Sequence, residues 1–153
     1  MSNQLLQPGT QAPQIAVQDQ DGNDVSVKDL AGKKAVIFIY PKDNTPTCTI
    51  EACNLRDNYA SFQAKGYTVI GLSPDSPRKH TNFINKFDLP YPLWADKDHA
   101  LIDAFGAWGE KNTFGKAYMG VIRSTFILDE NGTIVETIEK VKAKEHTAQI
   151  LRS

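Results

Sequence analysis

The stretch AVIFIYPKDNTPTCTIEACNLRDNYASFQAKGYTVIGLS, residues 35–73, decides the fold of the chain. It begins and ends with short apolar runs, residues 35–40 and 67–73, whose β-branched and aromatic side chains are typical of buried strands. Between them, apolar residues recur at intervals of four and three, which predicts a helix with one buried face. That face carries Cys48, Ala52, Leu55, Tyr59 and Phe62.

Gly66 is placed to end this helix. The order strand, helix, strand predicts a βαβ unit with a right-handed crossover, which makes the two strands parallel. Further helices are expected at residues 77–87, at 97–105 and, as a short terminal helix, at 144–153.

Two turn signals predict antiparallel hairpins. Glu130-Asn131-Gly132 separates the runs STFILD and TIVETIE, and Asp21-Gly22 separates two shorter runs near the start. Together with the βαβ unit, these hairpins predict an α/β, single-domain, thioredoxin-like fold over residues 1–153. Its mixed central sheet is flanked by helices and has an N-terminal β-hairpin extension.

The composition limits the partners of the chain. Its 153 residues fit one domain, and 41% hydrophobic residues with a formal net charge of -1 give no general attraction to nucleic acid or anionic membranes. Residues 1–14 lack the basic and apolar segments of a signal peptide, and nothing later approaches the ~20 apolar residues of a spanning helix. We therefore predict a cytoplasmic protein with no nucleic-acid partner and no membrane.

Both cysteines of the chain lie at the start of the predicted helix. Thr45 is a natural N-cap, with Pro46 at the first helical position, so Cys48 falls in the first turn. Unpaired amides and the positive end of the helix dipole favour a thiolate there. The position predicts a reactive Cys48.

Cys53 lies five residues further along the same helix. Five residues of α-helix rise by about 7.5 Å, above the ~7 Å between Cα atoms that a disulfide can bridge, so the two sulfurs can bond only if the helix start unwinds. Three other readings remain open: two small buried hydrophobic residues, a structural disulfide, or half of a zinc site. The three histidines lie far apart in sequence, and spacing alone does not decide between these readings.

The motif Pro-x-x-x-Thr-x-x-Cys, formed by Pro41, Thr45 and Cys48, resembles the signature of the peroxiredoxins. Cys53 within EAC and the NLRD segment after it are similar to the bacterioferritin comigratory protein, or Q-type, branch. Residues 71–77 and 108–132 agree with that branch, so the resemblance covers nearly the whole chain. One departure is Thr47, where members of the branch commonly have glycine.

The resemblance implies a role for each of five residues. Cys48 would be the peroxidatic cysteine and Cys53 the resolving one, Thr45 would hydrogen-bond the peroxide, and Pro41 would shield the sulfur from water. Arg123 would stabilise thiolate and peroxide, although without the resemblance it reads as an exposed strand arginine. Thr45 is also explained by capping alone, and an acid near a helix start complements the dipole, so Glu51 is left out of the catalytic set.

The implied activity is that of a thioredoxin-dependent thiol peroxidase, an atypical 2-Cys enzyme of antioxidant defence that needs no cofactor and no metal. Hydrogen peroxide or an organic hydroperoxide would oxidise Cys48 to a sulfenic acid, Cys53 would then form an intramolecular disulfide with it, and thioredoxin or a similar dithiol would reduce that disulfide. A monomer is expected.

Three alternatives accompany this reading. The first is a disulfide oxidoreductase, which normally needs Cys-x-x-Cys. The second is a non-catalytic module of the same fold. The third is a peroxidase whose Cys48 is resolved by an outside thiol.

Overall fold

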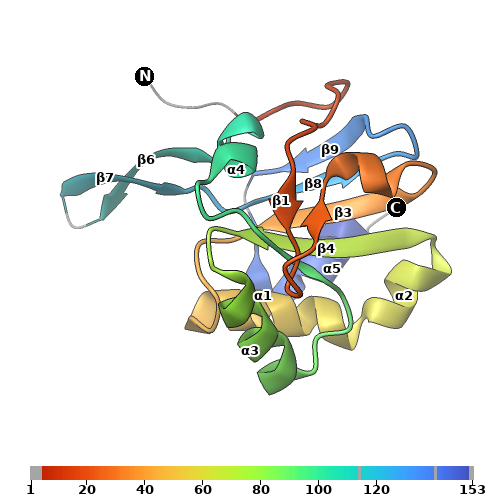
Figure 1. Ribbon diagram of the computed structural model, residues 1–153, viewed down its shortest axis with the longest axis horizontal. Helices are drawn as coiled ribbons and strands as arrows, with labels where there is room; N and C mark the ends of the chain where they lie inside the picture. The colour runs from red at the N-terminus through yellow and green to blue at the C-terminus, as the bar shows by residue number, and fades with distance from the viewer. Residues whose placement is uncertain (1–4, 114, 140, 152–153) are drawn as a thin grey trace.

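The computed structural model describes residues 5–113, 115–139 and 141–151. Its main sheet has seven strands in the order β2-β1-β5-β4-β3-β8-β9. The strands are β1 (Val17–Gln18), β2 (Asp24–Val25), β3 (Lys34–Ile39), β4 (Tyr67–Ser73), β5 (Leu93–Ala95), β8 (Ser124–Leu128) and β9 (Ile134–Ile138). Helices lie on both sides of this sheet (Figure 1). The mixed sheet and the small N-terminal hairpin of β1 and β2 agree with the predicted architecture.

The predicted βαβ unit is present, because β3 and β4 are parallel and in register from Lys34 opposite Tyr67 to Ile39 opposite Leu72. The helical segment between them differs from the prediction. It consists of two helices, α1 (Pro46–Asp57) and α2 (Tyr59–Ala64), which meet at Asn58.

The interruption at Asn58 has a local cause. Its side-chain amide donates to the carbonyl of Asn54 at 2.8 Å, and this bond offers the backbone an alternative to continuing the helix. The predicted apolar face still points inward, because four of its five residues are buried and Tyr59 packs against them.

The bounds of the other helices agree with the predicted ones to different degrees. Helix α3 (Pro77–Phe87) has the predicted bounds, whereas α4 (Ala100–Ala104) begins later than predicted because His99 has a left-handed backbone with φ 47°. Near the C-terminus, a 3-10 turn η2 (Ala143–Glu145) leads into α5 (His146–Ile150). The last two residues of the predicted terminal helix lie outside the described residues. A second 3-10 turn, η1 (Val27–Leu30), follows the N-terminal hairpin.

Strand β8 joins the sheet antiparallel to β3, with Ile39 opposite Ser124 and Phe38 opposite Thr125. Its other edge pairs with β9 around the predicted turn, where Gly132 has φ 77°. The start of β8 therefore lies beside the carboxyl end of β3, from which the chain enters α1.

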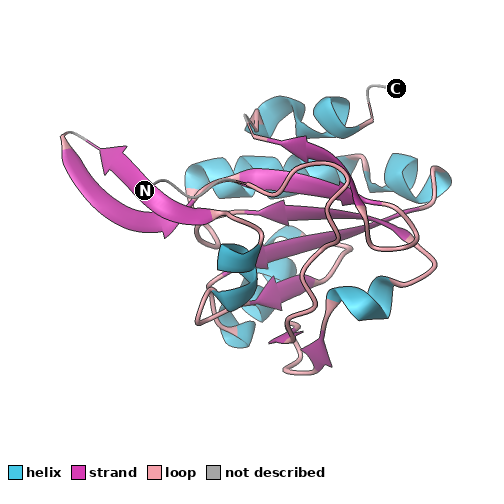
Figure 2. Cartoon of the chain, turned by 90° about the horizontal axis from the view of Figure 1, so that it is seen from above, coloured by secondary structure: helices cyan, strands magenta, loops and turns pink. Residues whose placement is uncertain are grey.

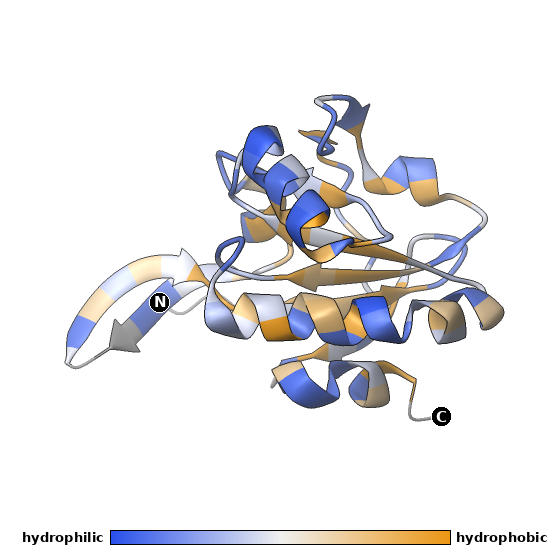
Figure 3. Cartoon of the chain, turned by 90° about the horizontal axis from the view of Figure 1, so that it is seen from below, coloured by the Kyte–Doolittle hydropathy of each residue, from blue (hydrophilic) through white to orange (hydrophobic). Residues whose placement is uncertain are grey.

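The sheet separates two apolar cores. One core packs α1, α2, α3 and α5 against one face, and the other packs the N-terminal segment, η1 and α4 against the opposite face. The central strands are predominantly hydrophobic (Figure 3), and β3 is buried on both faces. Burial on both faces explains why residues 35–40 form a continuous apolar run instead of an alternating one.

A two-stranded arm, β6 (Trp108–Thr113) and β7 (Lys116–Val121), projects from the body beside the sheet (Figure 2). It was not among the predicted elements. Its exposed strand residues, Tyr118 and Met119 among them, do not contribute to the buried apolar pattern that predicts the other strands.

Gly71 on β4 allows close packing beneath α3. A Cβ atom at this position would lie 2.5 Å from Leu93 Cδ2, 2.9 Å from Phe38 Cζ and 3.2 Å from Tyr40 Cε1. The rings of Phe38 and Tyr40 stack there with their centroids 5.4 Å apart. Leu93 and the two aromatic rings therefore occupy the space that a side chain at position 71 would need.

We expect Gly71→Ala to lower the free energy of unfolding by about 1–3 kcal/mol, because the added methyl group overpacks a core without free space. Urea unfolding followed by circular dichroism measures the change. Gly120→Ala is the matched control, since the atoms nearest to its Cβ would belong to the side chains of Lys111 and Tyr118 on the arm. Equal stability of Gly71→Ala and the wild type would show that this contact is not tight.

Candidate active site

The loop after β3 delivers the chain to the start of α1. Asn44 turns it with φ 61°, Thr45 has an extended backbone at the N-cap, and Pro46 is the first helical residue. The predicted cap is only partly correct. The Thr45 carbonyl accepts from Thr49 N at 2.8 Å, but the Thr45 hydroxyl donates to the Lys42 carbonyl at 3.1 Å and caps no helical amide. Capping by the side chain therefore does not explain this threonine.

Cys48 lies in the first turn of α1, as predicted, and is 2% exposed. The guanidinium of Arg123 donates from Nη2 to its sulfur at 3.1 Å. Arg123 follows β7 and directly precedes β8, and the pairing of Ser124 with Ile39 brings it to the start of α1. The interpretation of Arg123 as an exposed strand residue is therefore wrong, since its side chain is 21% exposed and contacts Cys48.

Glu51 binds the other side of the Arg123 guanidinium. Its carboxylate is fully buried, and Oε1 accepts from Nη1 of Arg123 at 2.5 Å. Burial alone would disfavour the charged guanidinium, but the Glu51 carboxylate and the Cys48 sulfur outweigh it and raise the pKa of Arg123. The arginine is therefore charged at any physiological pH.

Glu51 was not among the predicted site residues. The signal that could have included it is its spacing, because a residue three positions after Cys48 lies on the same helical face. Complementing the helix dipole does not by itself account for Glu51, since its side chain is 0% exposed and paired with Arg123.

The second oxygen of Glu51 faces a histidine from the C-terminal helix. Oε2 lies 2.8 Å from Nδ1 of His146, although neither atom has an aligned hydrogen bond. The other ring nitrogen, Nε2, is 2.7 Å from the hydroxyl of Thr125 on β8. A continuous line of polar contacts thus runs from the Cys48 sulfur through Arg123 and Glu51 to His146.

Cys53 lies in the intact third turn of α1 and is partly exposed, and both cysteines are free. The next residue, Asn54, fastens the helix to the C-terminal segment. Its side chain donates to the Lys144 carbonyl at 3.0 Å and accepts from Thr147 N at 2.8 Å. Within the described residues, no group of three or more His, Cys, Asp or Glu side chains could hold a metal ion.

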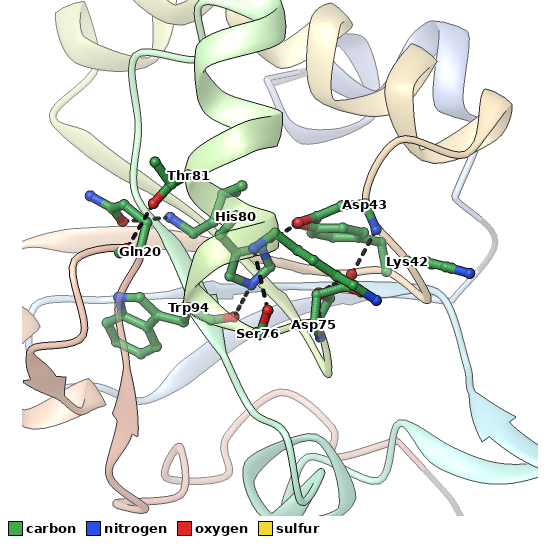
Figure 4. A network of polar contacts seen from close by, with 12 residues as sticks. Gln20, Lys42, Asp43, Asp75, Ser76, His80, Thr81 and Trp94 are labelled. Atoms are coloured by element: carbon green, nitrogen blue, oxygen red, sulfur yellow. Dashed lines mark hydrogen bonds and ion pairs between the residues drawn. The ribbon is translucent and has the colours of Figure 1, made fainter.

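A second polar network lies beneath the loop that carries Pro41 and Thr45 (Figure 4). Asp43 Oδ2 lies 2.7 Å from Nδ1 of His80, and the hydroxyl of Tyr40 donates to Asp43 Oδ1 at 2.5 Å. Nε2 of His80 lies 2.9 Å from the Trp94 carbonyl. Because a carbonyl only accepts, Nε2 is the donor in its contact with Trp94.

The same loop is tied to the end of β4. Asp75 Oδ2 accepts from the backbone amide of Asp43 at 2.7 Å and from the hydroxyl of Ser73 at 2.9 Å. These side chains are almost fully buried, so their bonds are strong and costly to break. The network fixes the chain between Tyr40 and Thr45, in which Pro41 is half-buried.

A family model, described as AhpC/TSA family, matches residues 8–137. The chain belongs to this family. It is similar over its length to peroxiredoxin Bcp of Bacillus subtilis, with 43% identity over 97% of this chain and 94% of that protein. Peroxiredoxin Bcp of Escherichia coli is 38% identical over 95% of this chain and 94% of its own length.

Solved structures agree with these relatives. Xanthomonas campestris peroxiredoxin Q superposes with a TM-score of 0.86 and 34% identity, covering 99% of this chain and 96% of that one. The predicted family, its bacterioferritin comigratory protein or Q-type branch and the thioredoxin-like fold are thereby confirmed. The protein is a peroxiredoxin that reduces peroxides with a thiol, as the sequence resemblance implied.

Among the described residues of this peroxiredoxin, no helix combines the length and apolarity that crossing a bilayer requires. The five predicted site residues lie in two segments. Pro41, Thr45, Cys48 and Cys53 belong to the loop and helix after β3, and Arg123 reaches Cys48 from the start of β8.

We expect Arg123→Ala to slow the oxidation of Cys48 by peroxide by about 10²-fold or more, because a positioned donor to the reacting atoms is lost. Stopped-flow oxidation of the reduced protein measures this rate. Alkylation by iodoacetamide, which needs a thiolate but no aligned peroxide, should change much less. An equal loss in both reactions would show that Arg123 acts only on ionisation of the thiol.

We expect Asp43→Asn to lower the free energy of unfolding by about 1–3 kcal/mol, because His80 and Tyr40 lose a charged, buried partner. Denaturant unfolding gives the value. Asp57→Asn is the matched control, since Asp57 forms a surface ion pair with Arg56, and it should cost no more than about 1 kcal/mol. Similar losses in the two variants would contradict a special role for the network.

Proposed function

We propose that Cys48 is the peroxidatic cysteine of this peroxiredoxin and Cys53 its resolving cysteine, with Thr45, Arg123 and Pro41 completing the peroxide site. The supporting observation is the 3.1 Å contact between Arg123 Nη2 and the Cys48 sulfur at the start of an intact helix that also carries a second free thiol. A merely buried pair of small hydrophobic residues would not recruit a charged guanidinium.

In the first step, the Cys48 thiolate attacks the nearer oxygen of a hydroperoxide. The O–O bond breaks, the departing oxygen takes up a proton as water or an alcohol, and Cys48 becomes a sulfenic acid. Arg123 has donors to spare beyond its contacts with Cys48 and Glu51, so it can also bind the peroxide. The Thr45 hydroxyl, one turn before Cys48, can donate to the same peroxide in place of the Lys42 carbonyl.

The size of the rate enhancement indicates what these residues must do. A free thiol of pKa about 8.5 is roughly 3% ionised at pH 7, so full ionisation would gain only about 30-fold. Enzymes commonly accelerate reactions by 10⁶-fold or more. The larger part must come from holding the peroxide in line and stabilising charge on the departing oxygen, which suits Thr45 and Arg123.

In the second step, the Cys53 thiol condenses with the sulfenic acid, releasing water and forming the Cys48–Cys53 disulfide. Intact α-helical geometry keeps the two Cα atoms too far apart for this bond, so the helix must unwind at its start. The absence of a side-chain cap on α1 favours such unwinding, while the bonds of Asn54 to Lys144 and Thr147 fasten the part that follows.

The reduced enzyme is then restored by an external dithiol, and thioredoxin is the reductant that we propose. Substrates are hydrogen peroxide and organic hydroperoxides. The Xanthomonas campestris bacterioferritin comigratory protein, a structural relative with 34% identity, has been studied for alkyl peroxide reduction activity, which supports the organic class. We further propose that residues 1–153 act as one catalytic domain, as a monomer in the cytoplasm.

One equivalent of hydrogen peroxide should convert the reduced protein within seconds to a form that has lost two hydrogens, with a Cys48–Cys53 link. Intact mass with peptide mapping detects it. Cys53→Ser should instead stop at a product with one added oxygen on Cys48, and Cys48→Ser should not react. Turnover of Cys53→Ser with thioredoxin at the wild-type rate would overturn the role of Cys53, and an unreactive wild type would overturn the peroxidase.

A further inference from the structure

His146 is the first residue of α5, and its side chain is fully buried between the sheet and α1. Its ring meets the ring of Phe38 on β3 edge to face, with centroids 6.2 Å apart and planes at 86°. A buried imidazole needs a polar partner at each nitrogen. Here the partners are Glu51 on α1 and Thr125 on β8, so three elements meet at one ring.

The partners define where the proton of the imidazole lies. The Glu51 carboxylate only accepts, whereas the Thr125 hydroxyl can donate or accept. A proton on Nδ1 of His146, facing Glu51 Oε2, with the Thr125 hydroxyl bonded to Nε2, therefore satisfies both neighbours. Nδ1 and Oε2 lie 2.8 Å apart, within ion-pair distance, although the two atoms do not form an aligned hydrogen bond.

We propose that His146 is a positioning residue for peroxide reduction. Its Nδ1–H fixes Oε2 of Glu51, so that Oε1 holds the Arg123 guanidinium in the orientation that aims Nη2 at the Cys48 sulfur. His146 touches neither the thiol nor the peroxide in this role. The inference rests on the proposed function of Cys48 and Arg123.

The geometry explains why Glu51 needs a second partner. With Arg123 alone, the carboxylate is bound at Oε1 and can swing about its Cγ–Cδ bond, because Oε2 forms no hydrogen bond among the described residues and its ion-pair contact is with His146. Swinging of the carboxylate would move the arginine with it. A displacement of about 1 Å in a positioned group can cost about 10²-fold in rate, so even partial loss of this restraint should be measurable.

The contact can be removed without releasing α5. Asn54 accepts from the Thr147 amide at 2.8 Å and donates to the Lys144 carbonyl at 3.0 Å, and the Thr147 hydroxyl donates to the Asn54 carbonyl at 3.3 Å. These bonds fasten the C-terminal segment to α1 independently of His146. Substitution of the histidine therefore tests the contact to Glu51 rather than the docking of the helix.

Two substitutions separate the two nitrogens of the ring. An asparagine at this position places its amide nitrogen close to the place of Nδ1, whereas a glutamine places it close to the place of Nε2. His146→Gln should therefore slow the oxidation of Cys48 by hydrogen peroxide in a single turnover by about tenfold or more. His146→Asn, made separately, should keep this rate within about threefold of the wild type.

Thr147→Val is the matched control, because it removes a contact between α5 and α1 without touching Glu51. It should leave the peroxide rate unchanged. Alkylation of Cys48 by iodoacetamide, measured on each variant, should change by less than about threefold, since that reaction requires no aligned arginine. Thermal unfolding of each variant shows whether the fold is intact.

Several results would overturn the inference. Wild-type peroxide rates in both histidine variants would show that Glu51 needs no second partner. Equal slowing in the asparagine and glutamine variants, or slowing in Thr147→Val, would assign His146 a role in packing only. A wild-type protein whose Cys48 does not react with hydrogen peroxide would overturn the proposed function and this inference with it. That result differs from the others because it concerns the wild type and not the variants.

Discussion

The ion pair between the partly exposed Arg123 and the buried Glu51 is the contact on which the site depends. It joins the start of β8 to the first turns of α1, two segments that are 72 residues apart in sequence. A buried carboxylate or guanidinium without a partner would cost several kcal/mol, so each requires the other. The pair uses Nη1 of the guanidinium and leaves Nη2 to donate to the Cys48 sulfur. The same ion pair therefore holds two elements together and positions a charged donor at the thiol.

Two polar networks on the same side of the sheet hold different parts of this site. One network holds the Cys48 sulfur through residues that follow it in sequence, namely Glu51, Arg123 and His146. Asp43, His80 and Asp75 fix the loop that precedes it. Since each member is bound to groups on other elements, the peroxide site is formed before any substrate arrives, which is the arrangement that electrostatic catalysis requires.

Much of the fold could be predicted because its core strands and helices carry strong local patterns. The runs 35–40 and 67–73, the helix after Ser76 and the Asn131-Gly132 turn all carry such patterns, and all four agree with the structure. The break at Asn58 and the late start of α4 could not be predicted, since a side-chain bond and a left-handed residue decide them. The β6–β7 arm escaped prediction because it packs mainly on itself.

The site was predictable where a motif carries it and not where tertiary contacts create it. Pro41, Thr45 and the two cysteines lie in one short segment, and Arg123 was found only through the family resemblance. Glu51 has only its spacing from Cys48 as a sequence signal and His146 has none, because an acid in a helix and a histidine near a C-terminus are usually solvated. Their roles follow from the pairing of β8 with β3 and from the docking of α5, neither of which any local pattern records.

The weak start of α1 sets a competition between two fates of an oxidised Cys48. The helix begins without a side-chain cap and without an acid in its first turn, and Thr47, Thr49 and Ile50 are β-branched residues of low helix propensity. A sulfenic acid in a rigid helix would wait for Cys53 and could meet a second peroxide, which converts it irreversibly to a sulfinic acid. A helix start that opens readily shortens that waiting time. Under the proposed mechanism, low local stability of these turns would protect the enzyme from inactivation by its own substrate.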